Sequence, residues 1–307
     1  HKMPFRLKAQ LAQVIQLPPD RIRVNLVPVG GDFGGKGFAT DVPLCYFLAR
    51  ATGRPIKMVT TFTEELQASN PRHPSVITLK TGVDRDGRIV ARTARAVFNG
   101  GAYAAFKPIP NVNIHGADQA GGVYRIPHFE LESIVTYTNC VPCGHARSPG
   151  EPQMIFAVES HTDMMAHELQ MDPAKFRMLN LIGEGEHLAS GHRLERVKAR
   201  ETLETALRAG GWDDPKRPFV GRGLSMSHRF AGLGESNARI RIEPDGTVNV
   251  ITATPDTGTG AHTVFQQIAA EVLGVPLKQV VVSPADTDTI ENDAGAGASR
   301  GTPLAGP

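Results

Sequence analysis

The sequence predicts an α+β fold of two related domains, each of which mixes helices with strand hairpins. Two observations predict it. A unit of helix, proline turn and strand near the start of the chain returns 258 residues later, where Pro276 matches Pro18. An Asp-Gly hairpin also occurs twice, at residues 83–89 and 242–248. One Asp-Gly hairpin is a weak signal, but two repeated features in a single chain indicate two domains with related folds.

The first half of the chain is expected to alternate helices and strands. Apolar residues at helical spacing predict a helix over residues 6–16, and Leu17-Pro18-Pro19 ends it before a strand at 22–27. The other elements expected in this half are a helix at 38–51, strand-rich stretches at 55–61 and 76–99, and a strand at 129–135.

The second half contains more helices, and it also contains the expected domain boundary. Helices are expected at 152–170, at 173–180 after Asp172, at 201–209 and at 264–273, with a strand at 280–282. Residues 213–220 are charged, contain two prolines and lack apolar periodicity. They are expected to link a first domain at 1–212 to a second at 221–307. We expect the first domain to lack its N-terminal part and the second to be incomplete.

The composition narrows the class of protein. Lys and Arg number 33 against 31 Asp and Glu, and the charges are scattered, so no basic patch favours nucleic acid or an anionic membrane. Small-molecule chemistry is the better expectation. The three cysteines are too few and too unevenly spaced for a disulfide framework, which favours a reducing, cytoplasmic environment. No stretch has the pattern of a signal peptide or a membrane span.

The most unusual stretch is residues 30–37, which contain five glycines, one Asp, one Phe and one Lys. Glycine lets the main chain turn through positive φ and approach a ligand without a Cβ in the way. Because the loop lies between an expected strand and an expected helix, its amides favour an anion such as phosphate. A tight structural turn would explain two or three of these glycines. The stretch also matches the start of a nucleotide-binding phosphate loop, but Gly37 stands where Ser or Thr must bind magnesium.

Two later glycine loops and one arginine suggest the same kind of ligand. Residues 256–263 precede an expected helix, and residues 295–302 form a third loop in which Ser299 can be an ordinary helix cap. Three such loops favour one ligand with several anionic or carbonyl groups. Arg147, in a loop rich in proline and glycine, can bind a phosphate or carboxylate through two parallel hydrogen bonds. A surface ion pair fits its local sequence equally well.

Cys140 and Cys143 form a C-x-x-C pair in the stretch before Arg147. Redox pairs of this kind act from a helix N-terminus, whereas an irregular loop follows this pair. No second pair is spaced to complete four zinc ligands. Structural cysteines are therefore the default interpretation.

Taken together, these stretches resemble the large subunit of the molybdenum hydroxylases, the xanthine dehydrogenase and aldehyde oxidase family. The resemblance spans nearly the whole chain. Its most specific parts are residues 30–36, 146–153 continuing through 156–160, and 172–177 with Asn180.

The resemblance implies that the chain is a fragment of a molybdopterin-binding subunit. The cofactor would be a molybdopterin, with a cytosine dinucleotide as in many bacterial members, between two domains that bind it. The cofactor-binding residues carried over from the family are Gly31, Asp32, Phe33, Gly34, Arg147, Gly258, Thr259, Gly297, Ala298, Ser299 and Arg300. The residues carried over to the substrate pocket are His115, Ser148 and Pro149. No protein ligand to the metal is implied.

The resemblance also implies a reaction and partners. Family members hydroxylate a carbon of an aldehyde or aromatic N-heterocycle with oxygen derived from water. A [2Fe-2S] cluster and FAD, on partner subunits or other domains, carry the electrons away.

The sequence departs from the family pattern at several positions. The family commonly has Gly where Asp32 stands and Gln where Thr259 stands. His115 replaces an arginine of the purine-oxidising members, which argues against purines, and Ser148 replaces the copper-binding cysteine of carbon monoxide dehydrogenases. The general-base glutamate, expected in a G-x-G-E context, has no counterpart here, and neither Glu151 nor Glu235 is in the matching context. No catalytic residue is therefore assigned, and this stretch alone is expected to be inactive. The alternative is a non-catalytic, truncated cofactor-domain protein that acts as a binding or partner module.

Overall fold

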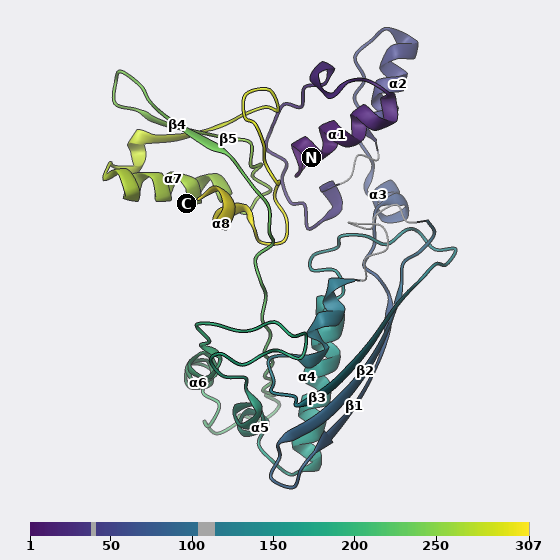
Figure 1. Cartoon of the computed structure of the whole chain (residues 1–307), viewed down its shortest axis with the longest axis vertical. Helices are drawn as coiled ribbons and strands as arrows, with labels where there is room; N and C mark the ends of the chain where they lie inside the picture. Colours follow the sequence, from purple (N-terminus) through teal and green to yellow (C-terminus); the bar gives the residue numbers. More distant parts are fainter. Residues whose placement is uncertain (38–40, 104–113, 307) are drawn as a thin grey trace. The chain divides into compact units, whose positions relative to one another are not determined.

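The computed structural model describes residues 1–37, 41–103 and 114–306, which form two compact units (Figure 1). The first, which we call the loop unit, comprises His1–Asn70, His145–Arg147 and Phe230–Pro307, and the second, the long-helix unit, comprises Pro71–Gly144 and Ser148–Arg229. Each unit combines helices with a three-stranded sheet, so the expected α+β class is confirmed. Both units are assembled from separate stretches of chain. The division at residues 213–220 stays a prediction.

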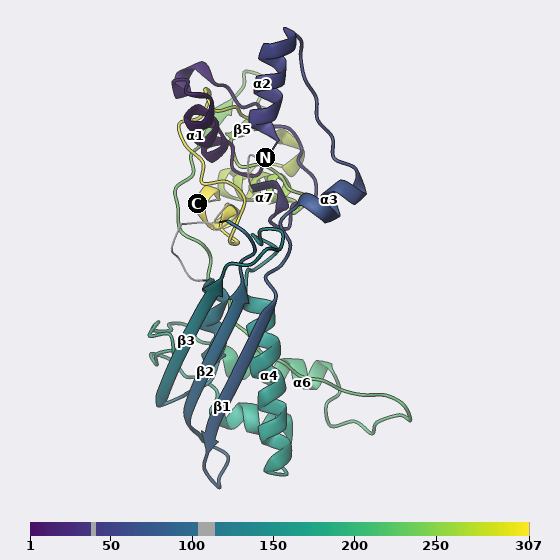
Figure 2. The same cartoon turned by 90° about the vertical axis from the view of Figure 1, so that its right-hand side faces the viewer.

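The long-helix unit is built on a sheet of β1 (Ser75–Val83), β2 (Ile89–Asn99) and β3 (His128–Thr136), in that spatial order (Figure 2). The first two strands are antiparallel, whereas β2 and β3 are parallel. At the turn between β1 and β2, the Asp84 carboxylate accepts a hydrogen bond from the Asp86 amide at 3.0 Å. The expected hairpin is therefore confirmed.

A long helix, α4 (Glu151–Glu168), lies against one face of this sheet, as Figure 2 shows. Phe98 of β2 and Met154 and Val158 of α4 are buried in the core that they share. The unit also contains the 3₁₀ helix η3 (His115–Gly121) and the helices α5 (Pro173–Asn180) and α6 (Ala199–Ala209). The helices expected in this part of the chain are confirmed, with small shifts at their ends.

The motif at residues 172–180 has a structural function. The Arg177 side chain is fully buried, and its Nε donates to the Glu159 carboxylate at 3.0 Å. The Tyr124 hydroxyl donates to the same carboxylate at 2.6 Å. Asn180 donates to the Gly87 carbonyl at 2.8 Å. Because a buried charge is stable only when it is paired, this network fixes α5 to α4.

The loop unit contains a second three-stranded sheet. Its elements are α1 (Pro4–Ile15), η1 (Pro19–Arg21), η2 (Gly35–Gly37), α2 (Val42–Thr52), α3 (Phe62–Ala68), β4 (Ala238–Ile242), β5 (Val248–Thr252), α7 (Ala261–Leu273), η4 (Leu277–Gln279), β6 (Val280–Pro284) and α8 (Gly301–Ala305). The strand order is β4-β5-β6, again with an antiparallel hairpin and then a parallel strand. The two Asp-Gly hairpins thus occupy the same place in the two sheets. No helix in the described ranges is long and apolar enough to cross a membrane.

Two expectations for the loop unit are wrong. Residues 22–27 form no strand: with the described residues they make only an isolated bridge, between Asn25 and Asp286, and not a continuous ladder. Residues 55–61 also form no strand, and α3 follows them. A capping box starts α3: the Glu64 amide donates to the Thr61 hydroxyl while the Glu64 carboxylate accepts from the Thr61 amide.

The helix expected at residues 38–51 begins later than the sequence indicates. Its first three residues, 38–40, lie outside the described ranges, and α2 starts at Val42 with Pro43 in its first turn. The end of the glycine-rich loop forms η2 instead.

Asp286 gives the loop unit a pH-dependent contribution to stability. Its carboxylate accepts hydrogen bonds from the Thr289 hydroxyl at 2.8 Å, the Asp288 amide at 2.9 Å and Arg23 Nε at 2.8 Å. Burial opposes ionisation, but these bonds outweigh it and lower the pKa of Asp286 to about 2. A lowered carboxyl pKa stabilises the fold above the unfolded value of about 4, and this contribution is lost as the pH falls toward 2.

Asp286→Asn is therefore expected to lower the melting temperature at pH 6 and to differ less from wild type as the pH falls from about 4 to about 2. Thermal melts across this range check it. The matched control is Asp20→Asn, at an exposed position of the same unit. A difference from wild type that is the same at pH 6 and pH 3 would contradict the prediction.

Candidate functional site

The three glycine loops predicted from the sequence all lie in the loop unit. We call them loop A (residues 30–37), loop B (256–263) and loop C (295–302). Loops A and B are joined just before loop A, where the Val29 amide donates to the Asp256 carbonyl at 3.3 Å. Lys2 joins loops A and C, because its amide donates to the Lys36 carbonyl at 3.0 Å and its carbonyl accepts from the Ala296 amide at 2.8 Å. Stretches more than 250 residues apart in sequence are thus tied together by main-chain hydrogen bonds.

Arg147 joins this group from the middle of the chain. Its amide donates to the Phe33 carbonyl at 2.7 Å, at the tip of loop A. Gly34 packs directly against the neighbouring His145: a Cβ placed on Gly34 would lie 1.2 Å from the His145 carbonyl oxygen. The structure therefore brings Phe33 and Arg147 together.

The tips of loops A and C have strained backbones. Phe33, Ala298 and Ser299 have φ values of 47°, 49° and 56°, in the left-handed region that residues with a side chain rarely adopt. Phe33 is 68% exposed despite being aromatic. Such strain costs on the order of 1–3 kcal/mol per residue and often occurs at functional sites. These loop tips are the best candidates for a binding surface.

In loop A, however, a carboxylate of the loop itself binds some of the main-chain amides. The Asp32 carboxylate accepts hydrogen bonds from the amides of Gly34 at 2.9 Å and Lys36 at 2.7 Å. The Lys2 ammonium pairs with it at 2.9 Å, and both side chains are more than nine-tenths buried. Asp32 therefore already occupies two amides of loop A, and ligand binding by this loop stays a prediction.

Loops B and C show the same arrangement. In loop B the Asp256 carboxylate accepts from the amides of Gly258 at 2.8 Å and Thr259 at 3.1 Å. At the start of loop C, the Asp293 carboxylate accepts from the Gly295 amide at 2.6 Å. Each loop is thus held in shape by an aspartate, which lies within loops A and B and two residues before loop C.

Several amides remain for a ligand. Among the described residues, no protein acceptor binds the amides of Gly31, Phe33 and Ala298. All three residues are exposed. These three amides are donors that suit the oxygens of an anionic ligand.

Arg300 holds loop C in place. Its Nη1 donates to the Leu233 carbonyl at 2.9 Å, its Nε donates to the Gly295 carbonyl at 3.3 Å, and its Nη2 donates to the Ala294 carbonyl. Burial lowers the pKa of Arg300. These bonds give Arg300 a structural function, and its contact with a cofactor stays a prediction. Gly297 lies beside Met3, with 3.2 Å between a Cβ built on Gly297 and the Met3 Cε.

The residues predicted for a substrate pocket lie in the long-helix unit. Ser148 has a left-handed φ of 56° and begins the turn into α4. The Pro149 carbonyl accepts from the Gly116 amide at 3.1 Å, so this turn adjoins η3, which begins at His115. The main chains of the three predicted residues therefore lie together.

Sequence reasoning missed Arg229, which contacts this turn. Its Nη1 donates to the Ser148 hydroxyl at 3.0 Å and to the Glu151 carboxylate. No local motif marks Arg229, because its partners lie about 80 positions earlier in the chain. The only signal available was its position at the end of an alternating polar and apolar stretch, residues 222–229.

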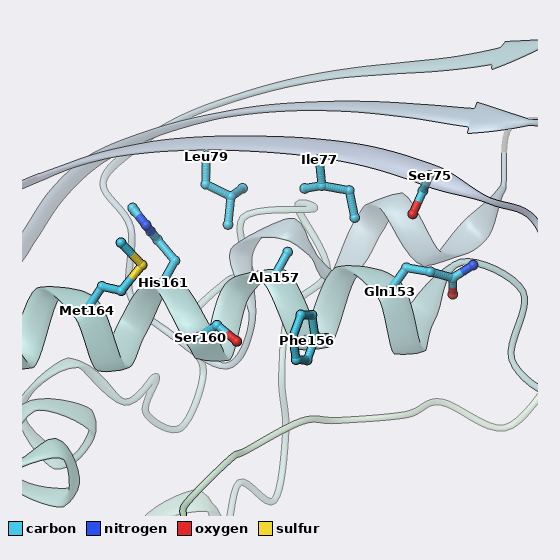
Figure 3. Close-up of a pocket in the computed structure, with 9 residues that line it drawn as sticks. All are labelled: Ser75, Ile77, Leu79, Gln153, Phe156, Ala157, Ser160, His161 and Met164. Carbon is cyan, nitrogen blue, oxygen red and sulfur yellow. The ribbon is translucent and has the colours of Figure 1, made fainter.

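A separate pocket of about 460 Å³ lies between β1 and α4 (Figure 3). Ile77 and Leu79 of β1 face α4 across it, and Phe156 of α4 lies at its side. His161 lies at one end, near Thr81, and burial with the nearby Arg92 charge lowers the pKa of its imidazole. The pocket contains none of the residues predicted to bind cofactor or substrate.

The cysteines do not form an activated pair. Cys140 and Cys143 are both free thiols, and burial raises the pKa of Cys143. A thiol with a raised pKa is a poor nucleophile at neutral pH, which supports a structural role. In the part of the chain that the structure describes, no three His, Cys, Asp or Glu side chains are placed to hold a metal ion.

The fold and the loops define a class of protein: a chain of two α+β units, one of which contains three glycine loops with exposed main-chain amides. Residues 1–181 and 197–307 each match a family model described as a molybdopterin cofactor-binding domain. The chain belongs to this family. The resemblance to molybdopterin-binding subunits of molybdenum hydroxylases is thereby confirmed.

Comparisons with individual proteins agree with this family assignment. The chain is 32% identical to the putative xanthine dehydrogenase molybdenum-binding subunit of Escherichia coli strain K12, covering 100% of this chain and 43% of that protein. It is 30% identical to the aldehyde oxidoreductase molybdenum-binding subunit of Escherichia coli O157:H7, covering 96% and 40%. The solved structure of quinoline 2-oxidoreductase from Pseudomonas putida 86 is 27% identical, with a TM-score of 0.90 over 98% of this chain and 42% of that one. The chain thus spans less than half the length of these relatives.

Proposed function

We propose that the chain is part of a molybdenum hydroxylase subunit that binds molybdopterin and oxidises an aldehyde or an aromatic N-heterocycle with oxygen from water. The convergence of loops A, B and C with Arg147 in one compact unit carries this proposal. The relatives are described as subunits of a xanthine dehydrogenase and an aldehyde oxidoreductase and, in one structure, as a quinoline oxidoreductase, which fits this range of substrates.

The residues of the loop unit would bind the cofactor's polar groups. The Arg147 guanidinium would form two parallel hydrogen bonds to its oxygens. The exposed amides of Gly31, Phe33 and Ala298 would complete the donor set, while Gly258 and Thr259 lie at the exposed end of loop B. When bound, the cofactor supplies the redox chemistry.

The residues of the long-helix unit would bind the substrate. Ser148 and Pro149 lie in the turn before α4, and this turn adjoins η3, which begins at His115. We further propose the cytosine dinucleotide form of the cofactor, partner subunits or domains that carry a [2Fe-2S] cluster and FAD, and a cytoplasmic location. The free thiols support the reducing environment.

One observation favours a second candidate, a non-catalytic module with the same fold. Asp32 places a carboxylate in loop A, where it occupies two amides and pairs with Lys2. A loop that has satisfied its own donors has fewer to offer a ligand.

Metal analysis of the complete subunit, purified with its natural partners, tests the proposal. We expect stoichiometric molybdenum, and a cytosine nucleotide released on acid hydrolysis. A well-folded complex that contains no molybdenum would support the non-catalytic alternative. Molybdopterin without a nucleotide would refute only the dinucleotide form.

A further inference from the structure

Arg229 holds the turn that leads into α4. Its ion pair with Glu151 is partly buried, with 35% of the Arg229 side chain and 17% of the Glu151 side chain exposed. The same Nη1 donates to the Ser148 hydroxyl at 3.0 Å. Because Ser148 has a left-handed backbone, the turn keeps its shape only when its surroundings fix it. Arg229 is one of the groups that fix it.

Arg229 reaches the turn at the end of an extended segment, residues 222–229, which we call the strap. Its side chains alternate between half-buried and exposed positions, and Leu224 and Met226 pack against the core of the long-helix unit. The strap belongs to no sheet. Its main chain is anchored to α4 at Met226, whose amide donates to the Glu159 carboxylate at 2.8 Å.

The two contacts between the strap and α4 are separated by similar distances along each of these segments. Glu151 and Glu159 are eight residues apart on α4, about 12 Å along a helix. Met226 and Arg229 are three residues apart, about 10 Å along an extended chain. The strap therefore runs antiparallel to α4 and carries Arg229 to the helix N-terminus.

Glu159 can act as this anchor because it is itself fixed. Arg177 and Tyr124 bond its carboxylate from within the core, at 3.0 and 2.6 Å. The position of the strap thus depends on a buried network, whereas its far end contacts the half-buried turn at Ser148.

We propose that Arg229 is a positioning residue for the proposed reaction: it fixes the Ser148 hydroxyl and the adjoining Pro149 in the shape that the substrate meets, and Glu159 anchors the strap that delivers it. The inference rests on the proposed function, because Ser148 and Pro149 line the substrate pocket only if that function is right. Arg229 itself need not touch the substrate.

Steady-state kinetics of the complete enzyme test this inference through a double-mutant cycle. Arg229→Ala is expected to raise KM about fivefold, with kcat and molybdenum content near wild type, because binding rather than chemistry is affected. Arg229→Lys should recover part of the loss, since it keeps the charge but not the planar fork. In a Ser148→Ala background, Arg229→Ala should add little, because two residues that act through one contact are not additive.

The control is Arg217→Ala, at an exposed position of the same unit that precedes the strap. Additive effects of the Arg229 and Ser148 substitutions would overturn the inference. So would a parallel loss of molybdenum and melting temperature in Arg229→Ala, which would indicate a merely structural role.

A second measurement requires no turnover and separates this inference from the proposed function. The Glu151 amide donates to the Ser148 carbonyl at 3.1 Å, so its hydrogen exchange reports on the turn. Exchange is expected to be at least about tenfold faster in Arg229→Ala than in Arg217→Ala. Equal exchange in both variants would overturn the inference, even in a complex that contains molybdenum and is active.

Discussion

Arg147→Ala in the complete enzyme is expected to lower molybdenum content or turnover at least tenfold, equivalent to about 1.4 kcal/mol or more. The reason is the loss of a guanidinium from the residue whose amide contacts Phe33 of loop A. The substitution leaves the main chain intact, so the bond from the residue 147 amide to the Phe33 carbonyl survives. The effect therefore reports on the side chain rather than on the attachment of loop A.

Metal analysis and steady-state kinetics on the purified complex measure this effect. Arg147→Lys should fall between wild type and Arg147→Ala, because lysine keeps the charge but cannot bind with two parallel hydrogen bonds. Arg54→Ala, at an exposed position of the loop unit, is the matched control and should behave as wild type. Metal content and turnover that are both unchanged in Arg147→Ala would contradict the cofactor-binding role.

Gly34→Ala should affect the fold of the site more than Arg147→Ala does. The added Cβ would lie 1.2 Å from the His145 carbonyl oxygen and 2.4 Å from its carbon. These are main-chain atoms, which cannot move aside as a flexible side chain does. Gly34 also has a φ of 111°, which alanine rarely adopts. A destabilisation of more than about 3 kcal/mol is expected, since the clash and the backbone strain act together.

The neighbouring glycine provides the control for this prediction. Around Gly35, a Cβ would find no atom closer than 3.8 Å, at the Asn70 side chain. Gly35→Ala should therefore retain both stability and metal content, whereas Gly34→Ala should lose both because loop A can no longer hold the segment before Arg147. Urea unfolding of the two variants measures their stability, and molybdenum analysis measures their metal content. Equal results for the two variants would show that the contact between Gly34 and His145 is unimportant.

The sequence by itself determined the local features of this protein. The Asp-Gly hairpins, the helix started by Asp172 and Pro173, and the glycine loops are specified by residues within a few positions of each other. Hydrophobic periodicity, caps and turn residues act over that range, so they are readable without coordinates. The loops and Arg147 could also be assigned to one family, because each carries its own short motif.

Predictions from local sequence failed at short apolar stretches. Residues 55–61 have the composition of a strand but find no strand partner in the described part of the chain. A strand is stabilised by its neighbour rather than by its own sequence, so β propensity alone overestimates such stretches. The capping box at Thr61 was the signal for α3, and it was readable.

Only the tertiary structure decided how the site is built. It showed that Asp32 and Asp256 satisfy amides of their own loops, and that Arg229 reaches Ser148 across 81 positions. Lys2 binds two loops that lie at opposite ends of the sequence. The physical reason is that a donor's partner depends on which groups the fold brings within about 3 Å, and that distance is unrelated to separation along the chain. Residue types indicate which groups can bind, whereas the fold determines which of them remain available to a ligand.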